Sequence, residues 1–310
     1  MVAQPSSRMS GRDFALVTVI CLAWAGNFLV SKLALREFPP LLFTALRLAL
    51  LAALLGKFVK RPPEGQWPRM FAVAISNGVL HFGLSFWSLK LSKTLASPSI
   101  LMQSHVPMAV VLAWWVRGER FHWRTGAAIG LSFVGVLVLG FDPAALASPT
   151  ALVLMLISAF FLATGTVLMR GLRGMTVVSQ QGWTAIFGVL PLLVASLVLE
   201  GDTGAAVRSA SWVGWLGVGY AAVMASLVGH GLFYVLTQRH PVARVSPYLL
   251  ATPLLATLLG VVFMHDKIGS RLLIGGAMVL SGVLVIALGS VSAARASQVS
   301  SSPPASPQSS

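Results

Sequence analysis

Three histidines lie inside long apolar stretches of the chain, where titratable side chains are rare. They are His81, His105 and His230. A neutral imidazole costs far less to bury than a carboxylate and titrates near physiological pH, so each can hold a proton in an apolar setting. A neutral histidine that only hydrogen-bonds neighbouring helices is the competing interpretation. We take His230 as the candidate for proton coupling, and His81 and His105 as candidates for contact with a bound polar molecule.

Arg47 is the only basic residue well inside an apolar stretch. A guanidinium at such depth is unfavourable unless it faces water or an anion, and its planar fork can hold a carboxylate through two parallel hydrogen bonds. The structural alternative is that it snorkels, or bonds free carbonyls beside a proline kink. Asn27 and Gln103 place amides at similar depth, which either recognise a zwitterionic or hydroxyl-bearing substrate or join helices. We predict that Asn27, Arg47, Gln103 and His105 approach one central cavity.

The acidic residues are excluded from the apolar stretches. All eight stand at their ends or between them: Asp13, Glu37, Glu64, Glu119, Asp142, Glu200, Asp202 and Asp266. Proton-driven carriers often use a buried carboxylate, so this chain would use a histidine instead or would run without tight coupling. The single cysteine, Cys21, allows no intrachain disulfide and no metal site built from thiolates. We expect neither a metal nor a cofactor.

Ten apolar stretches must position these side chains. They cover 13–35, 41–59, 67–89, 94–116, 122–140, 150–169, 177–199, 211–237, 243–264 and 270–289. A bilayer core about 30 Å thick is crossed by roughly 20 helical residues, and lipid offers the backbone no other hydrogen-bond partners. The chain is 56% hydrophobic and 10% charged, with a mean hydropathy of +0.83. We therefore predict an all-α integral membrane protein with ten transmembrane helices.

The last five stretches loosely repeat the first five. Three residues recur at a spacing of 146 or 147: Pro107, Glu119 and Gly135 against Pro253, Asp266 and Gly282. Because five is odd, the second half enters the membrane from the opposite side, which is the inverted-repeat design of secondary transporters. We expect five-helix repeats at 13–141 and 149–290, a cytoplasmic tail at 1–12, and a disordered cytoplasmic tail rich in Ser and Pro at 291–310.

Prolines interrupt the fourth and ninth stretches at related places. They are Pro98, Pro107, Pro247 and Pro253. A proline inside a helix removes a backbone hydrogen bond and kinks the helix. Paired interruptions in corresponding parts of two repeats point to the binding site of a transporter, so we interpret these four as gating or kink residues. The alternative is plain packing, because membrane helices tolerate proline.

The chain has a net charge of +14, and the positions of its cations indicate membrane topology rather than nucleic-acid binding. If the N-terminus is cytoplasmic, fourteen of the 22 lysines and arginines fall in inside segments and seven in outside segments. This bias predicts a multi-pass protein of the cell (inner) membrane with both termini in the cytoplasm. The loop with Arg117 and Arg120 would lie inside, and 142–149 outside. The first apolar run continues without a break to Leu35, so we expect no cleavage of a signal peptide.

Several motifs, in this order, resemble EamA-type exporters of the drug/metabolite transporter superfamily. They are Trp24-Ala25-Gly26-Asn27-Phe28, Pro39-Pro40 with Arg47, Gly118-Glu119-Arg120, and the run from Val228 to Pro253. The resemblance covers 13–290. It implies export of small polar metabolites or amino acids across the cytoplasmic membrane by alternating access, most similar to cysteine and O-acetylserine exporters. His230 stands where such exporters often have tyrosine, and Asp266 replaces the usual glutamate, so export of other metabolites or drugs is the alternative.

An integral-membrane enzyme is the rival class. It would need a metal cluster, an acid-rich motif or a nucleophile with an oriented base. The sequence contains no His-x3-His pair, no Asp-rich motif and no Gly-x-Ser-x-Gly. We therefore expect a carrier rather than an enzyme. Its expected partners are a small-molecule substrate and the lipid bilayer, without nucleic acid, and both a monomer and a homodimer are compatible with the sequence.

Overall fold

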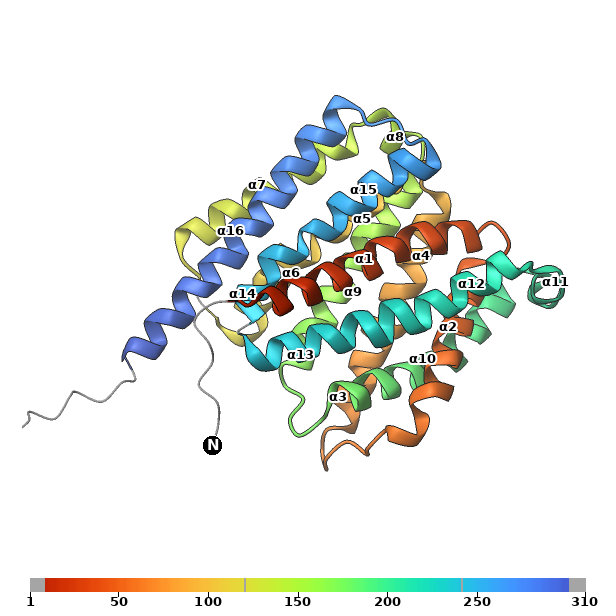
Figure 1. The fold of residues 1–310 in the computed structure, drawn as a ribbon, viewed down its shortest axis with the longest axis horizontal. Coiled ribbons are helices and arrows are strands. Elements are labelled where there is room, and N and C mark those ends of the chain that lie inside the picture. Colours follow the sequence, from red (N-terminus) through yellow and green to blue (C-terminus); the bar gives the residue numbers. More distant parts are fainter. Residues whose placement is uncertain (1–8, 120, 241, 301–310) are drawn as a thin grey trace, which may run out of the picture.

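The computed structural model describes residues 9–119, 121–240 and 242–300. Within these residues every regular element is a helix, and ten segments are long and apolar enough to cross a membrane (Figure 1). Each of their bounds lies within two residues of the predicted one. The predicted all-α membrane fold is therefore confirmed.

The first repeat contains five spans, three of which are composite. They are α1 (Gly11–Ala34); α2 (Pro40–Leu55) with the 3₁₀ turn η1 (Gly56–Phe58); α3 (Trp67–Val73), the π-helix η2 (Ala74–His81) and α4 (Phe82–Leu91); α5 (Ala96–Met102) and α6 (His105–Arg117); and α7 (Trp123–Gly140). The short helix α8 (Pro143–Leu146) leads to the second repeat.

The second repeat has the same order of elements. Its spans are α9 (Pro149–Met169); α10 (Val177–Leu199); α12 (Trp212–Tyr220), the π-helix η3 (Ala221–His230) and α13 (Gly231–Arg239); α14 (Val242–Leu249) and α15 (Ala251–Met264); and α16 (Ser270–Ser300). The short helix α11 (Thr203–Ser209) connects its second and third spans.

The helices at the two ends of the chain are longer than the sequence predicts. α1 begins two residues early, because Ser10 and Asp13 form a capping box that satisfies the first free amides. α16 continues to Ser300, so the first part of the segment expected to be disordered is helical. A helix that has already formed extends at little cost, since each further residue adds one hydrogen bond. The remainder of both predicted tails, 1–8 and 301–310, lies outside the described residues.

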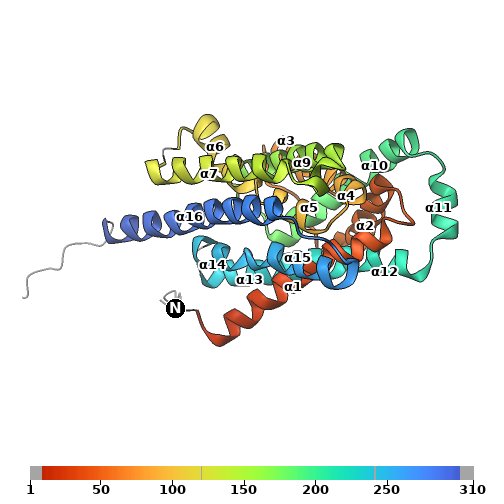
Figure 2. The same ribbon diagram turned by 90° about the horizontal axis from the view of Figure 1, so that it is seen from above.

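The two ends of the helix bundle differ in charge. We call one the acidic end, because its connections carry Glu37, Asp142, Glu200 and Asp266. We call the other the basic end, because its connections and helix termini carry Arg69, Arg117, Arg170 and Arg239. The start of α1 and the end of α16 lie toward the basic end, on the left of Figure 2, and α11 lies at the opposite end.

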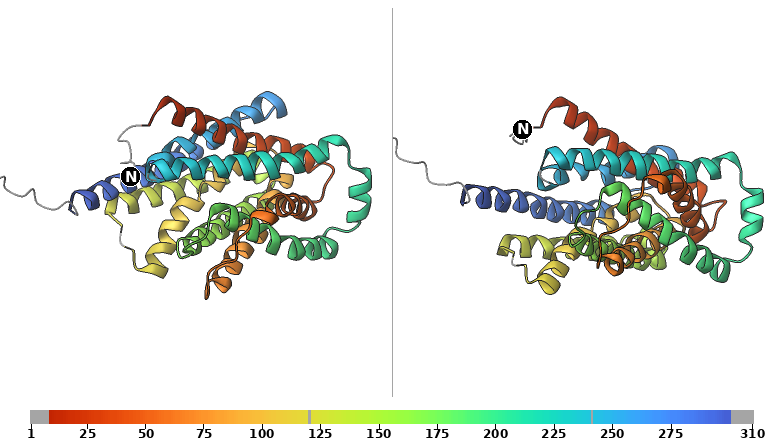
Figure 3. Two further views of the ribbon diagram at one scale, coloured as in Figure 1. Left: turned by 60° about the horizontal axis from the view of Figure 1, so that its bottom comes forward. Right: turned by 90° about the horizontal axis from the view of Figure 1, so that it is seen from below.

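The first helix of each repeat packs along the third span of the other repeat. α1 runs beside α12, η3 and α13, and α9 runs beside α3, η2 and α4 (Figures 1 and 3). Glycines permit this close approach. A side chain on Gly229 would collide with the Trp24 indole, and a side chain on Gly165 would collide with Asn77. The repeats are thus interlocked through these two pairs of spans.

α7 and α16 form a third contact between the repeats (Figure 1). A Cβ on Gly135 would come within 2.7 Å of the Gly275 carbonyl oxygen, so the two backbones touch directly. Close approach through glycine is a common way for membrane helices to associate.

Candidate functional site

Arg47 lies in the middle of α2 with only 2% of its surface exposed. Its guanidinium carbon is 4.0 Å from the centre of the Phe82 ring and 5.3 Å from that of Phe86. Nη2 donates to Ser226 Oγ at 2.9 Å, whereas Nε and Nη1 have no hydrogen-bond partner. No carboxylate among the described residues pairs with Arg47. The cation does not snorkel; it is buried, stacked on aromatic rings and short of an acceptor.

The balance of interactions at Arg47 favours an added anion. Stacking on aromatic rings contributes about 2 kcal/mol for a desolvated cation. Each buried donor without a partner costs about 1–3 kcal/mol, so stacking does not compensate for two free donors. A carboxylate that entered the site would accept hydrogen bonds from the free nitrogens and neutralise the charge.

Both third spans contain a π-helix, which the sequence does not predict. η2 ends at His81 and η3 at His230, so the two segments occupy corresponding places in the repeats. π-helical turns are rare and are frequent at functional sites. Each joins the first helix of the other repeat: Trp24 Nε1 donates to Ala225 O at 3.1 Å, and Ser158 Oγ donates to His81 O at 2.9 Å.

His81 is the most buried of the three intramembrane histidines, with 3% of its surface exposed. Its Nδ1 lies 2.9 Å from Ser158 Oγ, which connects η2 to α9. The Phe82 ring centre is 4.7 Å from that of His81 and 4.0 Å from the guanidinium carbon of Arg47, and Arg47 bonds Ser226 in the π-helix that ends at His230. The structure therefore brings Arg47 close to His81 and to the segment that carries His230.

His230 is half-buried beside α1. Its Nδ1 donates to Ala225 O at 2.9 Å, since a carbonyl can only accept. The other ring nitrogen, Nε2, is therefore the one that can take up a proton. The ring centres of His230 and Trp24 are 5.2 Å apart. This histidine thus lies where η3, α1 and the charge of Arg47 meet.

The remaining predicted polar residues make local contacts, and none of these described contacts reaches Arg47. His105 begins α6 and donates from Nδ1 to Met102 O at 2.8 Å. Gln103 is half-buried at the junction of α5 and α6. Asn27 accepts from Ser31 Oγ at 3.2 Å within α1. Neither amide hydrogen-bonds to Arg47 among the described contacts.

The four predicted prolines stand near breaks in the fourth and ninth spans. The fourth span breaks between α5 and α6, and the ninth between α14 and α15. The two breaks are flanked by Pro98 and Pro107 and by Pro247 and Pro253. Each break therefore separates two half-helices near mid-membrane, as the paired interruptions of a transporter site would.

Some residues of this region carry no signal in the sequence. Ser226 and Phe82 are the direct neighbours of Arg47, and Ser158 is that of His81. A serine or phenylalanine in an apolar span is unremarkable, and Ser226 is 179 residues from Arg47. Only the rarity of a buried arginine marks this place in the sequence.

The carboxylates of the acidic end hold helix termini of the opposite repeat, which the sequence also does not predict. Four of them accept from a backbone amide: Glu37 from Ser211 N (2.6 Å), Glu200 from Leu41 N (2.7 Å), Asp142 from Leu272 N (3.1 Å) and Asp266 from Leu95 N (2.6 Å). Carboxylates are favourable at such positions, because the first amides of a helix lack partners. Burial raises the pKa of Asp266 above its ordinary value of 3.8, and the Leu95 amide and Lys32 counteract the rise.

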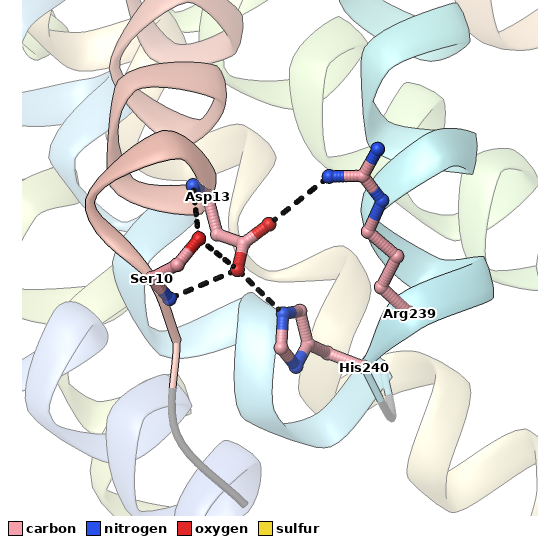
Figure 4. Close-up of polar contacts among 4 residues, drawn as sticks. All are labelled: Ser10, Asp13, Arg239 and His240. Atoms are coloured by element: carbon pink, nitrogen blue, oxygen red, sulfur yellow. Dashed lines mark hydrogen bonds and ion pairs between the residues drawn. The ribbon is translucent and has the colours of Figure 1, made fainter. Parts of the chain in front are cut away.

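The basic end has one buried polar cluster, shown in Figure 4. Asp13 accepts from Ser10, lies 2.9 Å from His240 Nε2, and reaches Arg239 Nη1 at 3.5 Å. Asp13 and His240 are 4% and 2% exposed. The cluster therefore connects the start of α1 firmly to the end of α13.

Ten spans in two five-span repeats, wrapped around a buried cation, define a transporter of small molecules. The EamA-like transporter family matches residues 14–141 and 149–288, so the chain belongs to this family and is a multi-pass membrane transporter rather than an enzyme.

Curated relatives agree with this assignment. A protein of Escherichia coli (strain K12) named "Probable amino-acid metabolite efflux pump" is 26% identical over 289 residues, which cover 91% of this chain and 96% of that protein. One of Salmonella typhimurium (strain LT2) with the same name is 28% identical over 292 residues, with the same coverage. A solved crystal structure with 19% identity covers 89% of this chain and 97% of its own, with a TM-score of 0.61, which supports the fold.

Proposed function

We propose that the protein exports small metabolites that carry a carboxylate, foremost amino acids of the cysteine and O-acetylserine kind. The observation that carries this proposal is Arg47, a buried cation with two free nitrogen donors and no acidic partner among the described residues. An amino acid supplies the missing carboxylate. The names of the two bacterial relatives support a substrate of this class.

The other polar residues of the region would surround the substrate. We infer that His81, His105, Asn27 and Gln103 line the route past Arg47, since they are polar residues within three different apolar spans. Their amides and imidazoles suit the amino and hydroxyl or thiol groups of a small zwitterion. His230 is the proposed site of proton coupling, because its Nδ1 is bonded to Ala225 O and its Nε2 is free to take a proton.

The unequal distribution of lysine and arginine between the two ends of the bundle supports an orientation in the membrane. We propose that the protein lies in the inner membrane with the basic end in the cytoplasm, since positive residues favour that side. The acidic end then faces outward.

The test of the proposed substrate class is Arg47→Lys in reconstituted vesicles. Lysine keeps the charge but loses the planar fork, so one charge-assisted hydrogen bond to the carboxylate is lost. A loss of about 1.5–3 kcal/mol corresponds to amino-acid exchange roughly ten- to hundredfold weaker. Lys57→Ala, which removes an exposed cation next to the same helix, is the control and should exchange normally.

Exchange at the normal rate by Arg47→Lys would remove Arg47 from the binding site. A lower yield of folded protein with normal exchange per molecule would support the structural alternative instead. The protein level in the vesicles is therefore measured alongside exchange.

A further inference from the structure

Two pairs of spans behave as rigid units, because each pair is joined at both ends. The α1 pair consists of α1 and the third span of the second repeat; it is held by Asp13 with His240 at 2.9 Å, and by Glu37 with Ser211 at 2.6 Å. One contact at each end of the pair restrains its two members from separating.

The α9 pair consists of α9 and the third span of the first repeat. Ser88 Oγ donates to Ala151 O at 2.6 Å at the acidic end, and Arg69 Nη1 donates to Gly171 O at 2.8 Å at the basic end. Movement between inward- and outward-open states must therefore occur between the α1 pair and the α9 pair.

Lys32 joins the two pairs at the acidic end. It stands in the last turn of α1, and its Nζ donates to three carbonyl oxygens at the end of α4: those of Leu89 (2.6 Å), Lys90 (3.1 Å) and Ser92 (2.6 Å). A cation at the carboxyl end of a helix is favourable, because the last carbonyls lack partners. The side chain is half-buried and lies in electrostatic contact with Asp266 of the second repeat.

Arg170 is the counterpart of Lys32 in the second repeat. It directly follows α9, as Lys32 stands at the end of α1. Its Nη1 lies 3.2 Å from Glu119, which is the repeat equivalent of Asp266, 147 positions earlier. Each cation thus faces the acid that follows the fourth span of the opposite repeat.

Lys32 and Arg170 differ in the groups to which they donate hydrogen bonds. Lys32 reaches across to the carbonyls of the other pair, whereas Arg170 bonds only Glu119 among the described contacts and its side chain is 47% exposed. By repeat symmetry, the carbonyls that correspond to those of α4 are at the end of α13. Among the described contacts, Lys32 therefore joins the two pairs at the acidic end, and Arg170 does not make the corresponding contact at the basic end.

We propose that Lys32 and Arg170 are a pair of alternating latches, of which Lys32 closes the acidic end in this state and Arg170 closes the basic end in the opposite state. In the opposite state Lys32 releases the end of α4, and Arg170 donates to the carbonyls at the end of α13. The inference rests on the chain being an alternating-access transporter and not on the nature of its substrate.

The test uses a thiol that is covered while the acidic end is closed. Ser92 is 8% exposed, and its carbonyl oxygen is one of the three that accept from Lys32. Ser92→Cys is made in a Cys21→Ser background, and its rate of reaction with a polar maleimide is measured in nanodiscs, where both ends meet solvent. That rate is proportional to the population in which the acidic end is open.

The two latches predict opposite effects at this one thiol. Lys32→Ala should raise the labelling rate severalfold, and Arg170→Ala should lower it severalfold, because it destabilises the state in which the acidic end is open. Lys32→Arg keeps a cation and should stay near the parent rate. Lys57→Ala is the control: it removes an exposed cation at the basic end that lies beside Phe58 of its own segment, and should leave the rate unchanged.

An unchanged rate in Lys32→Ala would overturn the proposal. So would a rise in both Lys32→Ala and Arg170→Ala, since that is the result of general loosening. Melting temperatures of all variants show whether each remains folded. Because no substrate is present, failure of this experiment leaves the proposed substrate class untouched, and failure of the Arg47→Lys test leaves the latches untouched.

Discussion

His230 leads to a prediction about energy coupling at the scale of a single residue. The described acids stand at the ends of the spans, so a proton-driven cycle would use an intramembrane histidine, and His230 keeps Nε2 available. His230→Gln should abolish accumulation of substrate driven by a pH gradient while it preserves exchange of substrate for substrate, since exchange requires no change of protonation. His230→Tyr, which introduces the residue that the family resemblance leads us to expect there, should fold normally and shift substrate preference.

The measurement compares gradient-driven uptake and exchange in the same vesicles. His122→Gln, at an exposed histidine that begins α7, is the control and should behave as the parent. If His230→Gln still accumulates substrate with an unchanged pH dependence, His230 is a packing residue and the proton uses another group.

The identity of the central residues could be predicted from the sequence, but their partners could not. Arg47 and the intramembrane histidines are conspicuous because ionisable groups are costly in lipid. Their neighbours Ser226, Phe82 and Ser158 are ordinary residues of apolar spans, and two of these three contacts cross between repeats. Only the packing of distant segments creates these contacts, so no local pattern signals them.

The elements at the two ends give a prediction about orientation. In a Cys21→Ser background, a cysteine at Ala147, which is exposed and follows α8, should react with an impermeant thiol reagent in intact cells. A cysteine at Glu64, exposed between η1 and α3, should react only after the membrane is opened. Ala145 would be a poor probe, since it is only 5% exposed. The reverse pattern of labelling would invert the proposed orientation.

The spans themselves could be predicted almost to the residue, because lipid imposes their length and hydropathy. The π-helices η2 and η3 could not, since a change of hydrogen-bond spacing within a continuous apolar helix leaves no mark in its composition. The prolines did indicate the breaks in the fourth and ninth spans. The helical continuation of α16 beyond Gly289 could not be predicted, because a Ser-rich composition is typical of disorder whereas the preceding helix extends into it at little cost.

The whole molecule consists of two interlocked repeats. Among the described contacts, Lys32 joins the α1 pair to the α9 pair at the acidic end. An odd number of spans in each repeat predicts their opposite insertion, but symmetry alone does not say which end is closed. That asymmetry lies in a few long-range contacts, above all Lys32 with the end of α4. With the proposed orientation, the latch proposal makes this a state closed toward the outside, in which Arg47 is buried with 2% of its surface exposed.

The central claim is tested most directly by comparing two self-exchange rates, that of cysteine and that of cysteamine. The two molecules share the amino group and the thiol, and differ only in the carboxylate that Arg47 is proposed to hold. Vesicles with the unaltered protein are loaded with unlabelled compound, and the entry of the labelled form is followed. We predict rapid exchange of cysteine and none of cysteamine above the level of protein-free vesicles. Equal exchange of both compounds, or exchange of cysteamine alone, would contradict the account.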